Sequence, residues 1–216
     1  MEKDFKRNKQ SHYKNRARVI YYGINVENKS SIIQALETCL SKINTKYESF
    51  LPYYETISSF IQSQKLQDND INIKYPNTFH ITTLFVGKNP NFKHHKAFTT
   101  FTKNKQVPIK IHGLAILPYK IATLICTTTE IVDNKFPHIT TLIGSFKPKQ
   151  SNDIMLSLFD TNQPYENEYT SYTTGVSNVD LIEQTTVNIE NVNESIYFTL
   201  LAEPIVVEGV MTEFTH

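Results

Sequence analysis

Residues 79–84 read Phe-His-Ile-Thr-Thr-Leu, and residues 137–142 read Pro-His-Ile-Thr-Thr-Leu. The chain of 216 residues therefore contains the sequence His-Ile-Thr-Thr-Leu twice, and each copy is soon followed by a glycine, Gly87 or Gly144. Both copies are short and rich in β-branched residues, which is typical of a strand. A repeat of this length in so short a chain indicates a functional element rather than chance.

The repeat places its polar side chains in pairs. Residues two apart in a strand point to the same face, so His80 shares a face with Thr82, and His138 shares one with Thr140. Two such strands side by side would present two imidazoles and two hydroxyls to one cleft. A single His-x-Thr in a strand is more often structural, but two copies in strand contexts favour a function.

This set of side chains suits phosphodiester transfer. Imidazole has an ordinary pKa near ~6.5, so at neutral pH one ring can accept a proton while the other donates one. Threonine hydroxyls can donate hydrogen bonds to the non-bridging phosphate oxygens, where charge builds in the transition state. We therefore predict His80 and His138 as catalytic residues and Thr82 and Thr140 as phosphate-binding residues, in a site that needs no metal.

The rest of the chain predicts an antiparallel α+β fold, because many short strands alternate with few helices. We expect strands at residues 19–26, 79–87, 107–117, 121–129, 137–144, 185–190, 195–201 and 205–214. We expect helices at residues 30–42, 47–67 and 152–159, with Ser30 and Ser31 capping the first of them. Residues 161–178 are polar and predict a long loop.

Composition narrows the choice of partner and compartment. The net charge of +1 argues against a protein that coats polyanions, so any contact with nucleic acid has to come from a local site. Cys39 and Cys126 lie in apolar stretches and are expected to be buried thiols, which fits a reducing compartment. We find neither an apolar run long enough to span a membrane nor a secretion signal. We therefore expect a cytosolic or nuclear protein, with residues 1–18 as a basic flexible tail and residues 19–216 as one domain.

The repeated motif resembles that of the 2H phosphoesterase superfamily, whose two motifs read His, apolar, Ser or Thr, apolar. Thr83 and Thr141 occupy the second apolar position here, which departs mildly from that pattern. Within the superfamily the chain is most similar to the 2′,3′-cyclic-nucleotide 3′-phosphodiesterases and to the cyclic phosphodiesterase domains of fungal and plant tRNA ligases. The doubled threonine, the opening strand at residues 21–24 and the closing segment at residues 197–210 carry this likeness.

The resemblance covers residues 19–214 and implies both a fold and an activity. The fold would be bilobal, with two antiparallel sheets flanked by helices around a central cleft. The activity would be hydrolysis of a 2′,3′-cyclic phosphate to a 2′-phosphate, without a metal or other cofactor. The substrate would be an RNA 3′ end or a cyclic nucleotide, in RNA repair or tRNA splicing.

Other residues suggest further sites. Tyr165, Tyr169 and Tyr172 in the polar loop could stack on a nucleobase, although exposed loop tyrosines are common. Lys147 and Lys149 could meet a distal phosphate, although solvated lysines are the commoner case.

Two other chemistries are less favoured. His94, His95 and His112 could form a metal site with the motif histidines, but no carboxylate or cysteine is spaced to complete it, so a surface role is favoured. Cys126 could act as a nucleophile, but its strand is expected to be core.

Several functions share the motif. A 2H enzyme that cleaves 2′,5′-linked oligoadenylate, or one that removes phosphate-linked caps from RNA, is the alternative within the enzymes. A module that binds RNA 3′ ends without turnover is the alternative from another class, although binding alone would not require both histidines.

Overall fold

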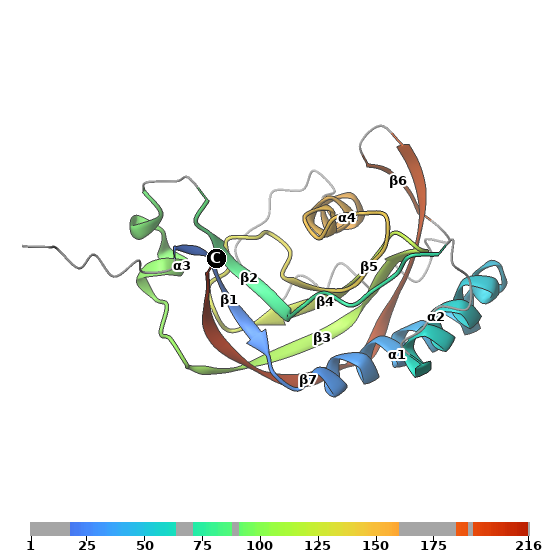
Figure 1. Cartoon of the computed structure of the whole chain (residues 1–216), viewed down its shortest axis with the longest axis horizontal. Coiled ribbons are helices and arrows are strands. Elements are labelled where there is room, and N and C mark those ends of the chain that lie inside the picture. Colours follow the sequence, from blue (N-terminus) through green and yellow to red (C-terminus); the bar gives the residue numbers. More distant parts are fainter. Residues whose placement is uncertain (1–17, 64–70, 88–90, 160–184, 190–191, 216) are drawn as a thin grey trace, which may run out of the picture.

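The computed structural model describes residues 18–63, 71–87, 91–159, 185–189 and 192–215. Its helices and strands form the expected α+β fold (Figure 1). In chain order they are β1 (Val19–Val26), α1 (Lys29–Lys46), η1 (Glu48–Phe50), α2 (Leu51–Ser63), β2 (Phe79–Phe85), η2 (Phe92–His94), α3 (Lys96–Thr99), β3 (Gln106–Leu117), β4 (Ile121–Thr128), β5 (His138–Ile143), α4 (Gln150–Phe159), β6 (Thr185–Ile189) and β7 (Val192–Thr215).

The strands build one continuous antiparallel sheet in the order β2-β1-β7-β3-β4-β5, and β6 pairs with β7 outside this path. The expected arrangement of two sheets in two lobes is not confirmed. The reason lies in β3 and β7, which pair antiparallel from Gln106 opposite Val210 to Ile116 opposite Tyr197. This long pairing joins the half that carries the first motif to the half that carries the second.

Strand β7 replaces two strands that the sequence predicted separately at residues 195–201 and 205–214. A proline cannot donate to a strand ladder and is therefore usually confined to strand edges, strand starts or bulges. Pro204 falls in a register irregularity, where residues 201–204 lie opposite the single residue His112. Since the ladder is already interrupted there, proline removes no needed hydrogen bond and the strand continues.

The helix predictions need two corrections. Asn28, rather than Ser30 or Ser31, caps α1, because the Asn28 side chain accepts a hydrogen bond from the Ser31 backbone N–H at 3.4 Å. The second predicted helix, at residues 47–67, begins as the short 3-10 helix η1 and continues as α2, which is described as far as Ser63. Its last residues, like the predicted loop at 161–178 and nearly all of the N-terminal tail, lie outside the described residues.

Helix α1 supplies one wall of the main core. Its buried side chains recur at helical spacing and belong to one buried cluster with side chains from both halves of the sheet. Ile81 and Ile139, the residues after the two motif histidines, are both fully buried in this cluster. The motif histidines are therefore carried on strands whose opposite face is fixed in the core.

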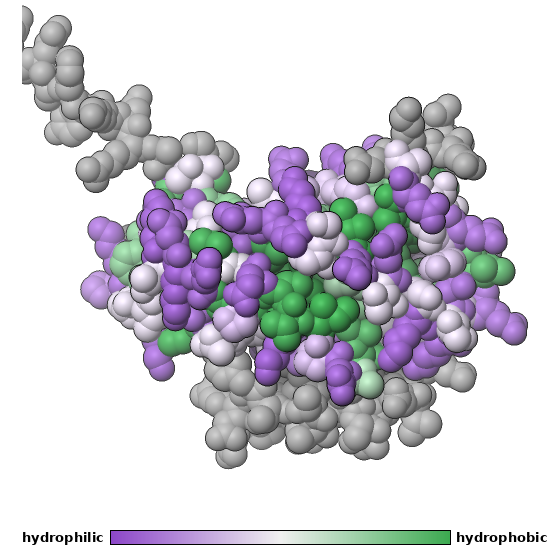
Figure 2. Space-filling model, turned by 90° about the horizontal axis from the view of Figure 1, so that it is seen from below, coloured by the Kyte–Doolittle hydropathy of each residue, from purple (hydrophilic) through white to green (hydrophobic). Residues whose placement is uncertain are grey.

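Most of the described surface is hydrophilic. Figure 2 shows one apolar area in the middle of the face seen from below, with hydrophilic side chains around it. The strongly exposed large apolar side chains among the described residues are Leu51, Phe85, Leu156 and Val206. Among the same residues no helix combines the length and the apolar character needed to cross a membrane.

Because both motif strands depend on this core, replacing Ile139 with alanine should lower the free energy of unfolding. We expect a loss of about 2 to 5 kcal/mol, since the change removes buried methyl groups and leaves a cavity. Val206 is 56% exposed, so Val206→Ala is the matched control and should change stability by less than about 0.5 kcal/mol. Urea unfolding measures both. Equal effects of the two changes would contradict the assignment of Ile139 to the core.

Candidate active site

The two motif strands lie at opposite ends of the strand order and yet contact each other. Backbone hydrogen bonds from the segment before each motif hold them together. Lys74 exchanges two hydrogen bonds of 2.9 Å with Ile143, just after the second motif, and the Asp133 N–H donates to the Thr83 carbonyl at 2.7 Å. Among the described residues, β2 and β5 form no ladder with each other. Along both motifs the edges of β2 and β5 are therefore held close to each other without pairing.

Both motifs also sit in the same kind of irregularity. The strand paired with each motif, β1 in one half and β4 in the other, has no residue opposite the second threonine. Thr83 and Thr141 are therefore the extra residues of two bulges. The flanking pairs are Tyr22 with Leu84 and Gly23 with Thr82 in one half, and Ala122 with Leu142 and Thr123 with Thr140 in the other. Thr83 and Thr141 are fully buried, and the Thr141 hydroxyl donates to the Ala122 carbonyl at 3.2 Å. These are the threonines that stand where the 2H pattern, which the motifs resemble, has an apolar residue, and in this structure they occupy the bulges.

The two histidine rings are oriented in the same way. His138 Nδ1 lies 2.8 Å from the Phe136 carbonyl oxygen, and His80 Nδ1 lies 3.3 Å from the Thr78 carbonyl oxygen. The Phe136 carbonyl can only accept, so Nδ1 carries the proton in the neutral form of His138, and the Thr78 carbonyl favours the same form of His80, whose Nδ1 also lies 3.2 Å from the Thr78 hydroxyl. The other nitrogen, Nε2, is then the atom that can accept a proton from a reactant, or donate one after protonation.

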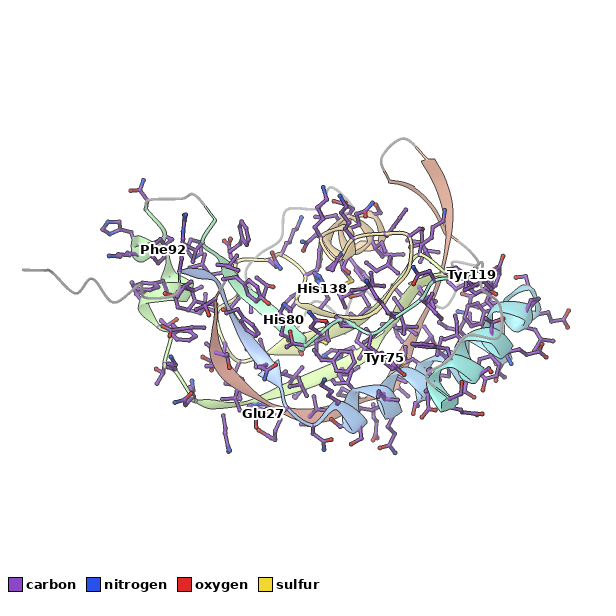
Figure 3. The ribbon with its side chains drawn as sticks, viewed as in Figure 1. Glu27, Tyr75, His80, Phe92, Tyr119 and His138 are labelled. Carbon is purple, nitrogen blue, oxygen red and sulfur yellow. The ribbon has the colours of Figure 1, made fainter. Side chains whose placement is uncertain are left out.

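The histidines are close enough to affect each other. Burial lowers the pKa of both rings below the ordinary value, and charge on His138 lowers the pKa of His80 further. Figure 3 shows both rings near the centre of the molecule. His138 is only 8% exposed, whereas His80 is half-buried. A bound phosphate anion would oppose this depression of the pKa, because a nearby negative charge favours the imidazolium.

The threonines of the site are half-buried, and one of them has a partner that the sequence did not reveal. The Thr140 hydroxyl lies 2.8 Å from the hydroxyl of Ser151, a fully buried residue in the first turn of α4. When Ser151 donates this bond, the proton of Thr140 is left to point elsewhere. No motif links the two residues, so only the packing of α4 beside β5 could show the contact.

Two aromatic rings beside His80 were also missed. Tyr21 on β1 and Phe214 on β7 have ring centroids 5.0 and 4.9 Å from that of His80. Tyr21 lies in the opening strand that resembles those of the superfamily, but no sequence signal pointed to either ring as part of the site.

Two of the other candidate histidines, His95 and His112, have partners outside the two motifs. His95 accepts from the Ala97 N–H at the start of α3 and lies 2.8 Å from the Asp133 carboxylate, and His112 lies 2.7 Å from the Thr127 hydroxyl. Within the described ranges, no three His, Cys, Asp or Glu side chains are grouped so that they could hold a metal ion.

The remaining candidates from the sequence are the cysteines, two lysines and three tyrosines. Both cysteines are buried, as predicted, and burial raises the pKa of Cys39 to about 12 and that of Cys126 as well. A thiol held in its neutral form is a poor nucleophile, so the structure does not support that chemistry for Cys126. Lys147 and Lys149 are exposed and lie just before α4. Tyr165, Tyr169 and Tyr172 lie outside the described residues.

Comparison with solved structures finds a similar fold in a crystal structure described as a fungal RNA kinase. The TM-score is 0.52 at 17% sequence identity, and the match covers 90% of this chain and 44% of that one. At this identity the likeness concerns the fold, and this chain matches less than half of the other protein's length. No protein-family model and no curated protein matches the sequence.

Because burial lowers the pKa of His138, the protein should lose stability as the pH falls. The unfolded chain takes up a proton near the ordinary pKa of 6.5, while the folded chain resists it, so the unfolded state binds more protons. The stability that depends on a neutral His138 ring is fully present above the pKa of this ring in the unfolded chain, and it is lost as the pH falls through and below that pKa.

Urea unfolding measured from about pH 7.5 to about pH 5.5 tests this linkage. His138→Asn keeps an N–H that can donate to the Phe136 carbonyl but has no titrating ring, so its stability should decrease less than that of the wild type. Parallel pH dependences of the two proteins would show that His138 is not held neutral by burial.

Proposed function

We propose that the protein hydrolyses 2′,3′-cyclic phosphates, at RNA 3′ ends or in nucleotides, to 2′-phosphates. The observation that carries the proposal is the matched setting of the two motifs. Each lies on an edge strand, each has a bulge at its second threonine, and each histidine has Nδ1 at the carbonyl two residues earlier. Acid–base cleavage of a single phosphodiester requires one group that accepts a proton and one that donates a proton, and two imidazoles on contacting strands can supply both.

In the proposed reaction one histidine accepts a proton and the other donates one. One imidazole takes a proton from water at Nε2 as the water oxygen attacks phosphorus. The bond between phosphorus and the 3′ oxygen breaks, and the other ring, as an imidazolium, donates its proton to that oxygen. The hydroxyls of Thr82 and Thr140 donate hydrogen bonds to the non-bridging oxygens as charge builds on them. Proton exchange with solvent then restores the starting state of both rings.

The structural neighbour supports the broader part of the proposal. A protein described as an RNA kinase shares the fold, which favours an enzyme that acts on RNA over other classes. We extend this to the processing of RNA ends in repair or tRNA splicing, in the cytosol or nucleus. The narrower choice of a cyclic phosphate rests on the resemblance of the motifs and on their geometry.

Incubation with 2′,3′-cyclic AMP in the presence of EDTA tests the activity. We expect adenosine 2′-monophosphate and no 3′-monophosphate, because the leaving group is the 3′ oxygen. The chelator should leave the rate unchanged, since the histidines supply both proton transfers. Loss of activity that a divalent ion restores would point to metal-activated water instead. No turnover of this substrate, together with cleavage of 2′,5′-linked oligoadenylate, would support the alternative enzyme.

Replacements in the motifs should follow a hierarchy. His80→Ala and His138→Ala should each lower kcat by about 10² to 10⁴. The double variant should lose far less than the product of the two, because the rings act as a unit. Thr82→Ala and Thr140→Ala should each cost roughly 2 to 3 kcal/mol in transition-state stabilisation, as the loss of one hydrogen-bond donor to developing charge does.

His112 provides a matched control for these variants. It lies on a strand of the same sheet and has its own partner in Thr127, so His112→Ala should retain activity. Full activity in a folded His80 or His138 variant would reduce the repeat to a feature of strand structure.

A further inference from the structure

His80 is in contact with two aromatic rings. The Tyr21 ring is stacked on the imidazole with an interplanar angle of 25°, and the Phe214 ring lies against it at 40°. Tyr21 and Phe214 are themselves stacked, with centroids 4.4 Å apart. The three rings come from β2, β1 and β7, which are adjacent in the sheet.

Phe214 reaches His80 because Gly23 has no side chain. Strand β1 separates β7 from β2, so the Phe214 ring has to cross the backbone of β1. A Cβ atom at position 23 would lie 3.1 Å from the Phe214 ring and 2.6 Å from the Ile81 carbonyl oxygen. The first distance is tighter than ordinary packing, and the second is a clash. Glycine at position 23 therefore leaves the space in which the Phe214 ring of β7 reaches the His80 ring of β2.

The rings act where the hydrogen bonds of His80 are weak. Its Nδ1 lies 3.3 Å from the Thr78 carbonyl and 3.2 Å from the Thr78 hydroxyl, whereas the corresponding distance at His138 is 2.8 Å. Hydrogen bonds at the longer distances orient a ring poorly. His138 is also held by burial. Tyr21 contributes in two ways. Its ring stacks on the His80 imidazole, and its phenol forms a hydrogen bond with the side chain of Thr78.

We infer that Tyr21 and Phe214 are positioning residues that fix the plane of the His80 imidazole and thereby the direction in which its Nε2 points. They touch His80 and act through it. The catalytic consequence rests on the proposed function, whereas the effect on the ring does not. Since an error of about 1 Å in the placement of a catalytic group can cost about 10²-fold in rate, even a modest loss of orientation should be measurable.

The experiment combines ¹⁵N NMR of the histidine rings with kinetics on 2′,3′-cyclic AMP. The test variants are Phe214→Leu and Tyr21→Leu, which keep apolar volume and remove the ring. Tyr21→Phe keeps the ring and tests rescue. Phe101→Leu is the control, because Phe101 packs on Tyr22 and not on His80. Thermal unfolding shows that each variant is folded.

We expect Phe214→Leu and Tyr21→Leu to broaden the His80 ring signals or to populate its second tautomer. They should lower kcat about tenfold and leave KM within about twofold, because orientation matters to proton transfer more than to binding. Tyr21→Phe should retain most of kcat, and Phe101→Leu should leave both readouts unchanged.

The two readouts separate this inference from the proposed function. Unchanged His80 signals and kcat in both leucine variants would overturn the inference and leave the proposed function standing. Disturbed His80 signals in a protein that does not cleave the cyclic nucleotide would uphold the positioning role and count against the proposed function. If one leucine variant fails to fold, the other still tests the inference by the same two readouts. Where both Tyr21 variants fold, equal loss of kcat in Tyr21→Phe and Tyr21→Leu would overturn the role of the ring.

Discussion

The site depends on how the two edges of the sheet are held. β2 and β5 do not pair along their motifs, but the segment that precedes each motif forms backbone hydrogen bonds to the other strand, at Lys74 with Ile143 and at Asp133 with Thr83. These bonds use backbone groups that edge strands would otherwise leave to water. They fix the spacing of the edges while leaving the residues between them without ladder partners. The two motif histidines therefore lie on facing strands that are held close together but do not pair.

The symmetry of the site follows from this arrangement and has clear limits. Both halves share the bulge and the carbonyl contact at Nδ1. They differ in what surrounds the ring, since His138 is nearly buried while His80 lies against Tyr21 and Phe214. A reaction in which one ring accepts a proton and the other donates one needs two different environments. The shared features therefore place the rings, and the unshared ones allow their roles to differ.

The sequence predicted the strands of the site well, because the pairing of His80 with Thr82 and of His138 with Thr140 follows from the period of a strand alone. It could not predict that β3 and β7 join the halves into one sheet, since strand partners far apart in the chain leave no local signal. The sequence also could not predict that β7 continues past Pro204, because a proline inside a register irregularity looks the same in sequence as one that ends a strand. Ser151 and Phe214 were missed for a related reason. Each meets the site only through packing of distant elements, and neither lies in a motif.

The central claim is that both motifs act on one phosphate. Titration with adenosine 2′-monophosphate, the proposed product, tests it directly when the ring signals of His80 and His138 are followed by NMR. The account predicts that both rings shift along one binding curve with a single ligand per chain, and that the pKa of each rises on binding, because the phosphate charge favours the imidazolium. A shift of only one ring, or two rings following separate binding curves, would contradict it.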